Sequence, residues 1–190
     1  MPRPIALVTS QSPEGRVNAA PFSFFNVFAK EPPLVVLGLG ISPLGGAKDT
    51  TLNIRDTGEF VVNLVDEPIA EAMNLCAIDF PPQISEVEVA GFRPHPERCG
   101  RAAAHRPGAG RPGMPALRHA AAGARPLPVI GDVLMPHIRD GILDPASLRV
   151  ARHAYAPIGR LFGGGYVRTH DRFEMPRLTY SEWLARRSGG

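Results

Sequence analysis

The sequence predicts a single, mainly β (α+β) domain, 1–190, with short peripheral helices, and three observations support this. The chain of 190 residues has about the length of one domain. Short apolar, partly β-branched runs such as residues 4–10 and 34–39 alternate with turns rich in Gly and Pro, which is typical of strands. Helix start and stop signals occur at few places, after Lys48 and over residues 67–78.

The N-terminal strands are expected to pair as a hairpin. Residues 12–15, between an apolar run and a second extended segment over 16–20, have Pro at the second and Gly at the fourth position, as a type I turn favours. After Pro32 and Pro33, residues 34–39 are almost continuously apolar, the pattern of a strand covered on both faces. We expect this segment to be a central strand of a barrel.

Two helices are expected in the middle of the chain. Asp49 or Thr50 is predicted to cap a helix that Gly58 ends, and residues 59–64 form the next strand. A second helix is predicted over 67–78, because Pro81 and Pro82 stop it.

The segment 98–126 differs from the rest of the domain. It consists almost entirely of Arg, Ala, Gly, Pro and His and lacks any strand periodicity, and order returns at 127–135. Two interpretations remain open, a natural flexible insertion and out-of-frame translation of a GC-rich gene, because loops longer than about 15 residues are unusual inside a compact domain. Residues 177–190 are expected to be a C-terminal tail.

Composition and charge exclude several classes of protein. The formal charge of +3 depends on six arginines in the segment 98–126, so nucleic acid is not expected as a partner. There is no apolar run long enough to cross a membrane and no secretory signal pattern, which predicts a cytoplasmic protein without a membrane partner. Cys76 and Cys99 lack metal-site spacing and are expected as one buried and one incidental thiol, so no metal site is predicted.

The most informative stretch is residues 18–26, where small residues and Pro alternate with aromatics. Close backbone approach at Pro21, Phe22 and Ser23, with Asn18 in support, would supply directional contacts to a flat heteroaromatic ring. The alternative is a plain strand whose phenylalanines fill the core.

A second candidate site follows the Gly-rich turn at residues 45–46. Lys48, Asp49, Thr50 and Thr51 begin a helix there, and free N–H groups, the positive end of the helix dipole, the ammonium and the two hydroxyls would bind a phosphate. The alternative is an ordinary capped helix. Dinucleotide fingerprint and P-loop patterns are both missing from the sequence.

A third stretch, residues 159–166, contains three consecutive glycines flanked by Arg160 and Tyr166. It lines a cofactor pocket or only turns a corner, and the sequence does not decide between the two. No catalytic side-chain cluster of the hydrolase or metalloenzyme type is present, so no catalytic residue is predicted.

The ordered motifs resemble the flavin-reductase-like family, which includes flavoredoxins and the reductase components of two-component monooxygenases. The resemblance extends over residues 2–96 and 127–176. Its motifs are PRPIALV, NAAPFSFF, KDT, NI, GEFVVNL, GRL and RFEMP, in that order from residue 2 to residue 176.

This resemblance implies a split β-barrel homodimer with FMN near the subunit interface, its phosphate beside residues 48–51 and its ring edge at residues 21–23. It also implies an oxidoreductase in which NADH or NADPH binds transiently and passes a hydride to flavin N5, with a monooxygenase component as a partner that accepts reduced flavin. A non-enzymatic FMN-binding electron carrier and a nucleic-acid-interacting module using the Arg-rich segment are the alternatives.

Three departures from the family pattern accompany the resemblance. Ser42 stands where members often carry Arg, so one phosphate charge is expected to be missing. Members usually have about twenty residues before the Pro-Arg-Pro strand, which raises the hypothesis that Met1 is a misplaced start. Members also have further barrel strand and helix where this chain has the segment 98–126.

Overall fold

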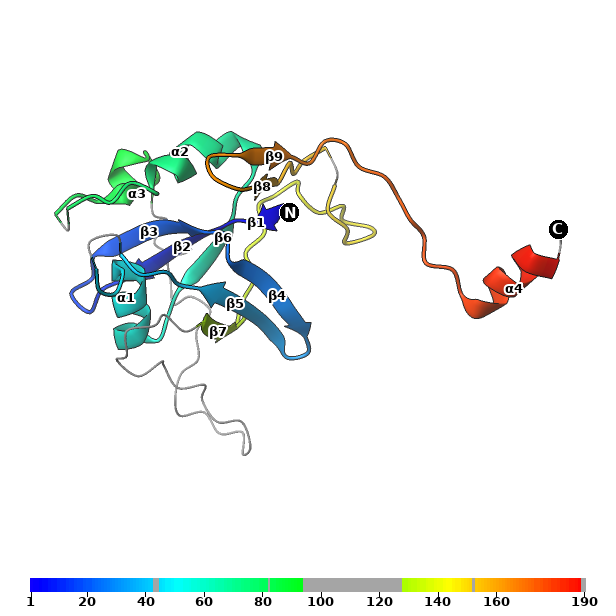
Figure 1. Cartoon of the computed structure of the whole chain (residues 1–190), viewed down its shortest axis with the longest axis horizontal. Helices are drawn as coiled ribbons and strands as arrows, with labels where there is room; N and C mark the ends of the chain where they lie inside the picture. The colour runs from blue at the N-terminus through cyan, green and yellow to red at the C-terminus, as the bar shows by residue number, and fades with distance from the viewer. Residues whose placement is uncertain (43–44, 82, 94–127, 152, 189–190) are drawn as a thin grey trace, which may run out of the picture.

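The computed structural model describes residues 1–42, 45–81, 83–93, 128–151 and 153–188. These residues form a body of strands with short helices around it, and a C-terminal arm that extends away from the body (Figure 1). The described strands form three antiparallel sheets of three strands each. The predicted segment 98–126, with Cys99, lies outside the described residues.

One sheet contains the predicted N-terminal hairpin. Its order is β3-β2-β6, formed by β3 (Val17–Phe22), β2 (Ala6–Gln11) and β6 (Val61–Leu64). The turn is confirmed, since the Gly15 N–H donates to the Ser12 carbonyl at 2.9 Å and Gly15 has a φ of +89°. Among the described strands β3 pairs with β2 alone, so it is an edge strand of the sheet that the structure describes.

The second sheet places the apolar run 34–39 at its centre, as predicted. Its order is β4-β5-β7, formed by β4 (Phe25–Lys30), β5 (Pro33–Gly38) and β7 (Pro128–Asp132). The third sheet, β1-β8-β9, joins β1 (Arg3–Pro4) with β8 (Ile158–Arg160) and β9 (Tyr166–Arg168).

Strand β2 separates two hydrophobic clusters. Ala6 and Val8, both fully buried, face the first cluster, which joins this sheet to Val35 and Leu37 of β5. Leu7, on the opposite face, belongs to the second cluster. The alternation of side chains along a strand thus places core on both sides of β2.

Helices cover the second cluster from outside. Met73 of α2 (Ala70–Leu75) and Val87 of α3 (Glu86–Val89) pack there with Cys76 and Ile158, and Figure 1 shows α2 and α3 on the side of β2 and β3 opposite to β4 and β5. Cys76 is the buried thiol that the sequence predicts, and burial raises its pKa to about 11, so it is a protonated packing residue at neutral pH.

The first helix ends as predicted but begins differently. α1 (Asp49–Thr57) stops at Gly58, which adopts the left-handed conformation and donates its N–H to the Ile54 carbonyl at 2.8 Å. The N-cap is Lys48, without a side-chain cap, so the predicted cap at Asp49 or Thr50 is wrong. The Thr50 hydroxyl instead accepts a hydrogen bond from Asn18.

The predicted helix over 67–78 is shorter and begins with a tighter turn. Residues Glu67–Ile69 form a 3₁₀ turn (η1), and α2 then extends only to Leu75. Turn hydrogen bonds at Ala77 and Ile78 close the segment before Pro81. The mainly β architecture with short peripheral helices is confirmed.

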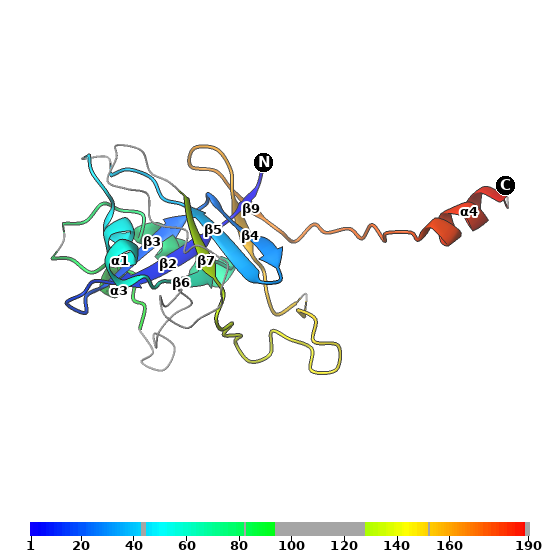
Figure 2. The same ribbon diagram turned by 90° about the horizontal axis from the view of Figure 1, so that it is seen from below.

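The C-terminal arm holds α4 (Tyr180–Ser188) away from the body in both views (Figures 1 and 2). Tyr180 and Trp183 stack at a centroid distance of 5.8 Å, and both side chains are exposed. Among the described helices, none is long and apolar enough to span a membrane.

Gly131→Ala is expected to destabilise the protein by about 1 to 3 kcal/mol, because overpacking forces neighbours to move. A Cβ at this position of β7 would lie 2.7 Å from Cζ of Phe60, which is buried in the first cluster. Urea unfolding measures the effect. Gly40→Ala is the control, since its Cβ meets no atom within 4 Å; equal stability of the two variants would contradict the packing of β7 against Phe60.

Candidate functional site

Strand β3 connects the two candidate regions that the sequence predicts. Asn18, near its start, donates from Nδ2 to Oγ1 of Thr50 at 2.9 Å, which ties the first turn of α1 to the strand. Thr50 is 1% exposed. Asn18 and Thr50 therefore position the helix start. The Thr50 hydroxyl oxygen accepts the hydrogen bond from Asn18.

The first turn of α1 offers donors that the described residues leave without partners. Oγ1 of Thr51 is buried and forms no hydrogen bond with the described residues. The Leu52 N–H donates to the Lys48 carbonyl at 3.0 Å. The N–H groups of the first helical residues point out of the helix, toward any bound anion. Lys48 is half-buried beside them.

The loop before α1 is held by a turn of its own. Gly45 donates to the Ser42 carbonyl at 2.9 Å, and Ser42 donates to the Gly46 carbonyl at 3.1 Å. Both glycines have φ above +80°, where a side chain would be strained. Ser42 therefore lies in the loop that leads into the helix start, and at this position the chain offers a hydroxyl where the family often has a guanidinium.

Two carboxylates border this region. Asp49, the first residue of α1, is exposed and stabilises the helix dipole from the N-terminal end. The Glu86 carboxylate accepts a hydrogen bond from the Ala19 N–H of β3, and burial raises its pKa, partly offset by that bond and assisted by the charge of Asp49. Glu86 thus occupies an edge donor of β3 between Asn18 and Pro21.

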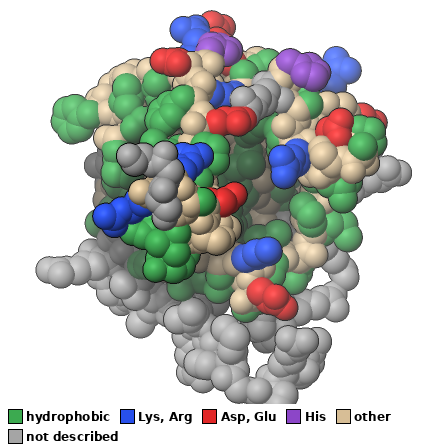
Figure 3. All heavy atoms as spheres, turned by 90° about the vertical axis from the view of Figure 1, so that its right-hand side faces the viewer, with side chains coloured by type: hydrophobic (Ala, Val, Ile, Leu, Met, Phe, Trp, Pro, Cys, Tyr) green, Lys and Arg blue, Asp and Glu red, His purple; other side chains and the backbone are tan. Residues whose placement is uncertain are grey.

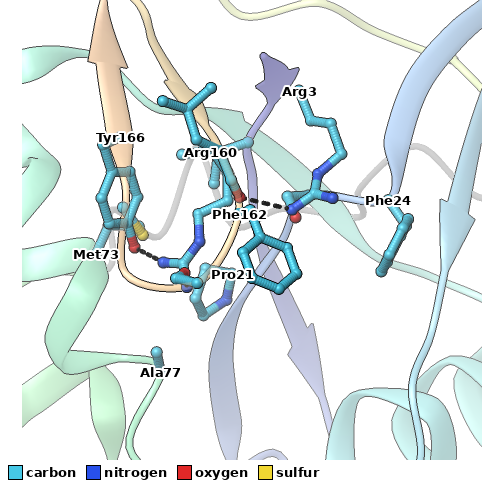
Figure 4. Close-up of a pocket in the computed structure, with 12 residues that line it drawn as sticks. Arg3, Pro21, Phe24, Met73, Ala77, Arg160, Phe162 and Tyr166 are labelled. Carbon is cyan, nitrogen blue, oxygen red and sulfur yellow. Dashed lines mark hydrogen bonds between the residues drawn. The ribbon is translucent and has the colours of Figure 1, made fainter. Parts of the chain in front are cut away.

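A cavity of about 500 Å³ lies at the other end of β3. Four of the predicted residues line it: Pro21, Ser23, Arg160 and Tyr166. Apolar side chains complete the wall, and Figure 4 shows Met73 and Tyr166 on one side and Phe24 on the other, with Phe162 between them.

The glycine-rich stretch 159–166 both turns a corner and lines this cavity. It is the β8–β9 hairpin, closed by a hydrogen bond from the Leu161 N–H to the Gly165 carbonyl at 2.9 Å. Arg160 donates to the Tyr166 hydroxyl and to the Gly163 carbonyl, and its Cζ lies 4.6 Å from the centroid of the Tyr166 ring. Tyr166 in turn donates to Oδ1 of Asn74 at 3.2 Å, which fixes the hairpin against α2.

Arg3 is a cavity residue that the sequence analysis did not select. Its Nη2 donates to the Leu161 carbonyl at 3.1 Å, its Cζ lies 4.9 Å from the centroid of the Phe24 ring, and its Nε is buried without a partner among the described residues. The sequence did contain one signal for Arg3, because it belongs to the first motif of the family resemblance, residues 2–8. The contact with Leu161, 158 residues away, was not available.

The structure places the predicted residues at the two ends of a strip that runs along β3, from the start of α1 to the cavity. Lys48, Thr50, Thr51 and Asn18 lie at one end, and the cavity residues lie at the other. Asn18 and Pro21 are three residues apart on β3, about 10 Å at the rise of an extended strand. Phe22 differs, because its side chain is 7% exposed and packs in the first cluster with Phe25, as the core interpretation of the aromatics expects.

The residues present fit FMN on the chemistry of their donors. The unpartnered Thr51 hydroxyl, the Lys48 ammonium and the start of α1 suit a phosphate. At the other end, Pro21 and Ser23 beside apolar and aromatic surface suit a flat ring with polar edges. The separation along β3 leaves room for a linker between the two groups.

Comparisons with known proteins identify the family to which the chain belongs. The family model described as "Flavin reductase like domain" matches residues 1–123. An uncharacterized protein of Halalkalibacterium halodurans is 38% identical over 196 residues, covering 96% of this chain and 88% of its own.

Two similar solved structures extend the comparison. Nitrilotriacetate monooxygenase component B from Bacillus cereus has a TM-score of 0.74 at 30% identity, with 92% of this chain and 88% of that chain covered. The Pseudomonas fluorescens 2-nitrobenzoate 2-nitroreductase has a TM-score of 0.69 at 33% identity, with 95% and 87% covered. The split β-barrel fold that the sequence resemblance implies is confirmed, and the chain belongs to the flavin-reductase-like family of flavin-binding oxidoreductases.

Proposed function

We propose that the protein binds FMN along β3 and uses NADH or NADPH to reduce it. The observation that carries the proposal is the buried Thr51 hydroxyl, which is left without a partner at the same helix start as Lys48. Burying a polar group without a hydrogen bond costs free energy, so such a group in a native fold calls for a ligand or another explanation. A phosphate oxygen would satisfy it.

Each part of the strip then has a role in binding. Lys48 and Thr51 hold the phosphate, Asn18 keeps α1 in place through Thr50, and Ser42 and Asp49 border the same turn. Pro21 and Ser23 contact the ring edge, with Phe22 contributing its backbone because its side chain is in the core. When bound, FMN supplies the redox chemistry, since its N5 accepts the hydride that oxidation of the nicotinamide releases.

The side chains around the cavity support chemistry that belongs to the cofactor. Among the described residues that line it there is no Asp, Glu, His, Lys or Cys side chain. The protein therefore positions the reactants and shapes the charge around them. No protein residue is assigned as catalytic.

A non-enzymatic FMN carrier is the second candidate function. Phe162 borders the cavity and is 97% exposed. Its exposure does not distinguish a carrier from a reductase. Steady-state oxidation of NADH or NADPH by the FMN-loaded protein separates the two functions. Turnover supports the reductase, and tight FMN binding without turnover supports the carrier.

We also propose that the protein is a homodimer. Three apolar side chains of β4 and the turn before it are exposed, with Phe24, Val27 and Phe28 each at least 61% exposed. Figure 3 shows hydrophobic side chains interspersed with charged ones on this side of the molecule. The arm adds exposed Phe173 and Met175. Several large apolar side chains exposed on neighbouring residues support a protein interface here.

A monooxygenase component is the proposed acceptor of reduced flavin. The support is the similarity to nitrilotriacetate monooxygenase component B at 30% identity over 92% of this chain. The similarity to a nitroreductase at 33% identity favours direct reduction of a small molecule as the other outcome. Product analysis with and without a monooxygenase component distinguishes them.

Lys48→Ala is expected to weaken FMN binding by about 1.5 to 3 kcal/mol, the range for a hydrogen bond to a charged group. Flavin absorbance and fluorescence titration give the dissociation constant. Lys30→Ala is the matched control, because the Lys30 ammonium is exposed at the end of β4. An unchanged dissociation constant in Lys48→Ala would remove Lys48 from the site.

Thr51→Val is expected to have opposite effects on binding and stability. The valine keeps the shape and removes a buried hydroxyl that has no partner, so the unliganded protein should be equally or more stable. FMN affinity should fall about tenfold, because a bond to phosphate is lost. Thermal unfolding with and without FMN measures both quantities; unchanged affinity would show that the hydroxyl does not meet the phosphate.

Phe28→Asp is expected to shift the protein from dimer to monomer, since a charge buried in an apolar interface costs several kcal/mol. Light scattering after size exclusion gives the mass. The control is Leu148→Asp, an exposed apolar residue on a separate loop. A monomeric unmodified protein, or a dimer unaffected by Phe28→Asp, would contradict this interface.

A further inference from the structure

We propose that the cavity at the end of β3 binds a small aromatic carboxylate, and that Arg3 recognises its carboxylate. The inference deepens the proposed function, on which it rests, by naming a ligand class for the wall of the cavity that faces Pro21 and Ser23. Three features support it: the unused hydrogen-bond donors of Arg3, the neutral partners of Arg160 and the apolar residues that line the cavity.

The Arg3 guanidinium is positioned but largely unsatisfied. A guanidinium has five N–H donors, and within the described residues Arg3 uses one of them, from Nη2 to the Leu161 carbonyl. The buried Nε has no partner among the described residues. Figure 4 shows the Arg3 side chain reaching toward the cavity between Phe162 and Phe24. A carboxylate could accept from Nε and a second nitrogen in the bidentate geometry that arginine favours.

Arg160 adds a second positive charge, and no acid among the described residues neutralises it. It donates hydrogen bonds to the Tyr166 hydroxyl and the Gly163 carbonyl, which are neutral acceptors. Neither arginine forms an ion pair within the described part of the chain, whereas Arg139 pairs with Asp66 and Arg168 pairs with Glu67. The described cavity lining contains no Asp or Glu. Its charge therefore attracts an anion.

The rest of the lining is apolar and favours an aromatic body on that anion. Phe24 and Phe162 are 69% and 97% exposed although they border the cavity, so a ligand would cover apolar surface that is now in contact with water. Ile5 and Met73 form the floor and belong to the second hydrophobic cluster. A ligand with a flat ring and one carboxylate matches both features.

The test uses benzoate and its neutral counterpart benzamide, titrated by calorimetry into the full chain with and without FMN. We expect benzoate to bind and benzamide to bind at least tenfold more weakly, because only benzoate carries the charge. Arg3→Gln should lower benzoate affinity at least tenfold, and Arg3→Lys, which keeps the charge without the planar fork, should lie between. Arg55→Gln is the control, since Arg55 is exposed and pairs with Asp56; it should bind benzoate as the unmodified chain does.

Three results would overturn the inference: equal binding of benzamide and benzoate, benzoate affinity unchanged in an Arg3→Gln protein that unfolds cooperatively, or Arg3-dependent binding of ADP-ribose that is tighter than that of benzoate. The last would assign Arg3 to the pyrophosphate of a nicotinamide cofactor. If Arg3→Gln does not fold, Arg3→Lys carries the comparison. Failure of the proposed function has a separate signature, because FMN absorbance would then stay unperturbed whatever benzoate does.

Discussion

The burial of both faces of β2 is the constraint on which the rest of the structure depends. Ala6 and Val8 on one face and Leu7 on the other are at most 3% exposed. Each face therefore requires its own cover, which β5 supplies on one side and α2 and α3 supply on the other. A register shift by one residue would exchange the two sets of side chains, so the pairing of β2 with β3 and β6 fixes both clusters at once.

Among the described strands, β3 is an edge of its sheet, and the candidate site lies along that edge. An unpaired strand edge has free N–H and C=O groups that can join another strand. Here α1 and α3 approach it, with Asn18 bonded to Thr50 and the Ala19 N–H bonded to Glu86. Between and beyond these contacts the strand keeps backbone groups close to both the helix start and the cavity. A long ligand lying along β3 would use the edge that no described strand occupies.

The sequence predicted local features well and distant contacts poorly. The turn at Gly15, the helix stop at Gly58 and the central strand over 34–39 follow from nearby residues, and all were correct. The cap of α1 was wrong because the Thr50 hydroxyl bonds Asn18, 32 positions away. Among the adjacent aromatics, the sequence could not separate Phe22, which is buried, from Phe24, which is exposed at the cavity, because the chain bends between β3 and β4. Arg3 was missed because its contact with Leu161, 158 positions away, cannot be predicted from nearby residues.

The distribution of acidic groups explains why the cavity remains electropositive. Glu67, on η1, is held by Arg168 and His170, which lower its pKa, and Asp66 is held by Arg139. These carboxylates are neutralised next to the β8–β9 hairpin but outside the Arg3 wall. Arg160, which lies in the same hairpin as Arg168 and on the same face of it, bonds neutral oxygens within the described part of the chain. Arg168 of β9 therefore forms an ion pair with Glu67, whereas Arg160 of β8 forms no ion pair within the described residues, and under our proposal its charge attracts the ligand.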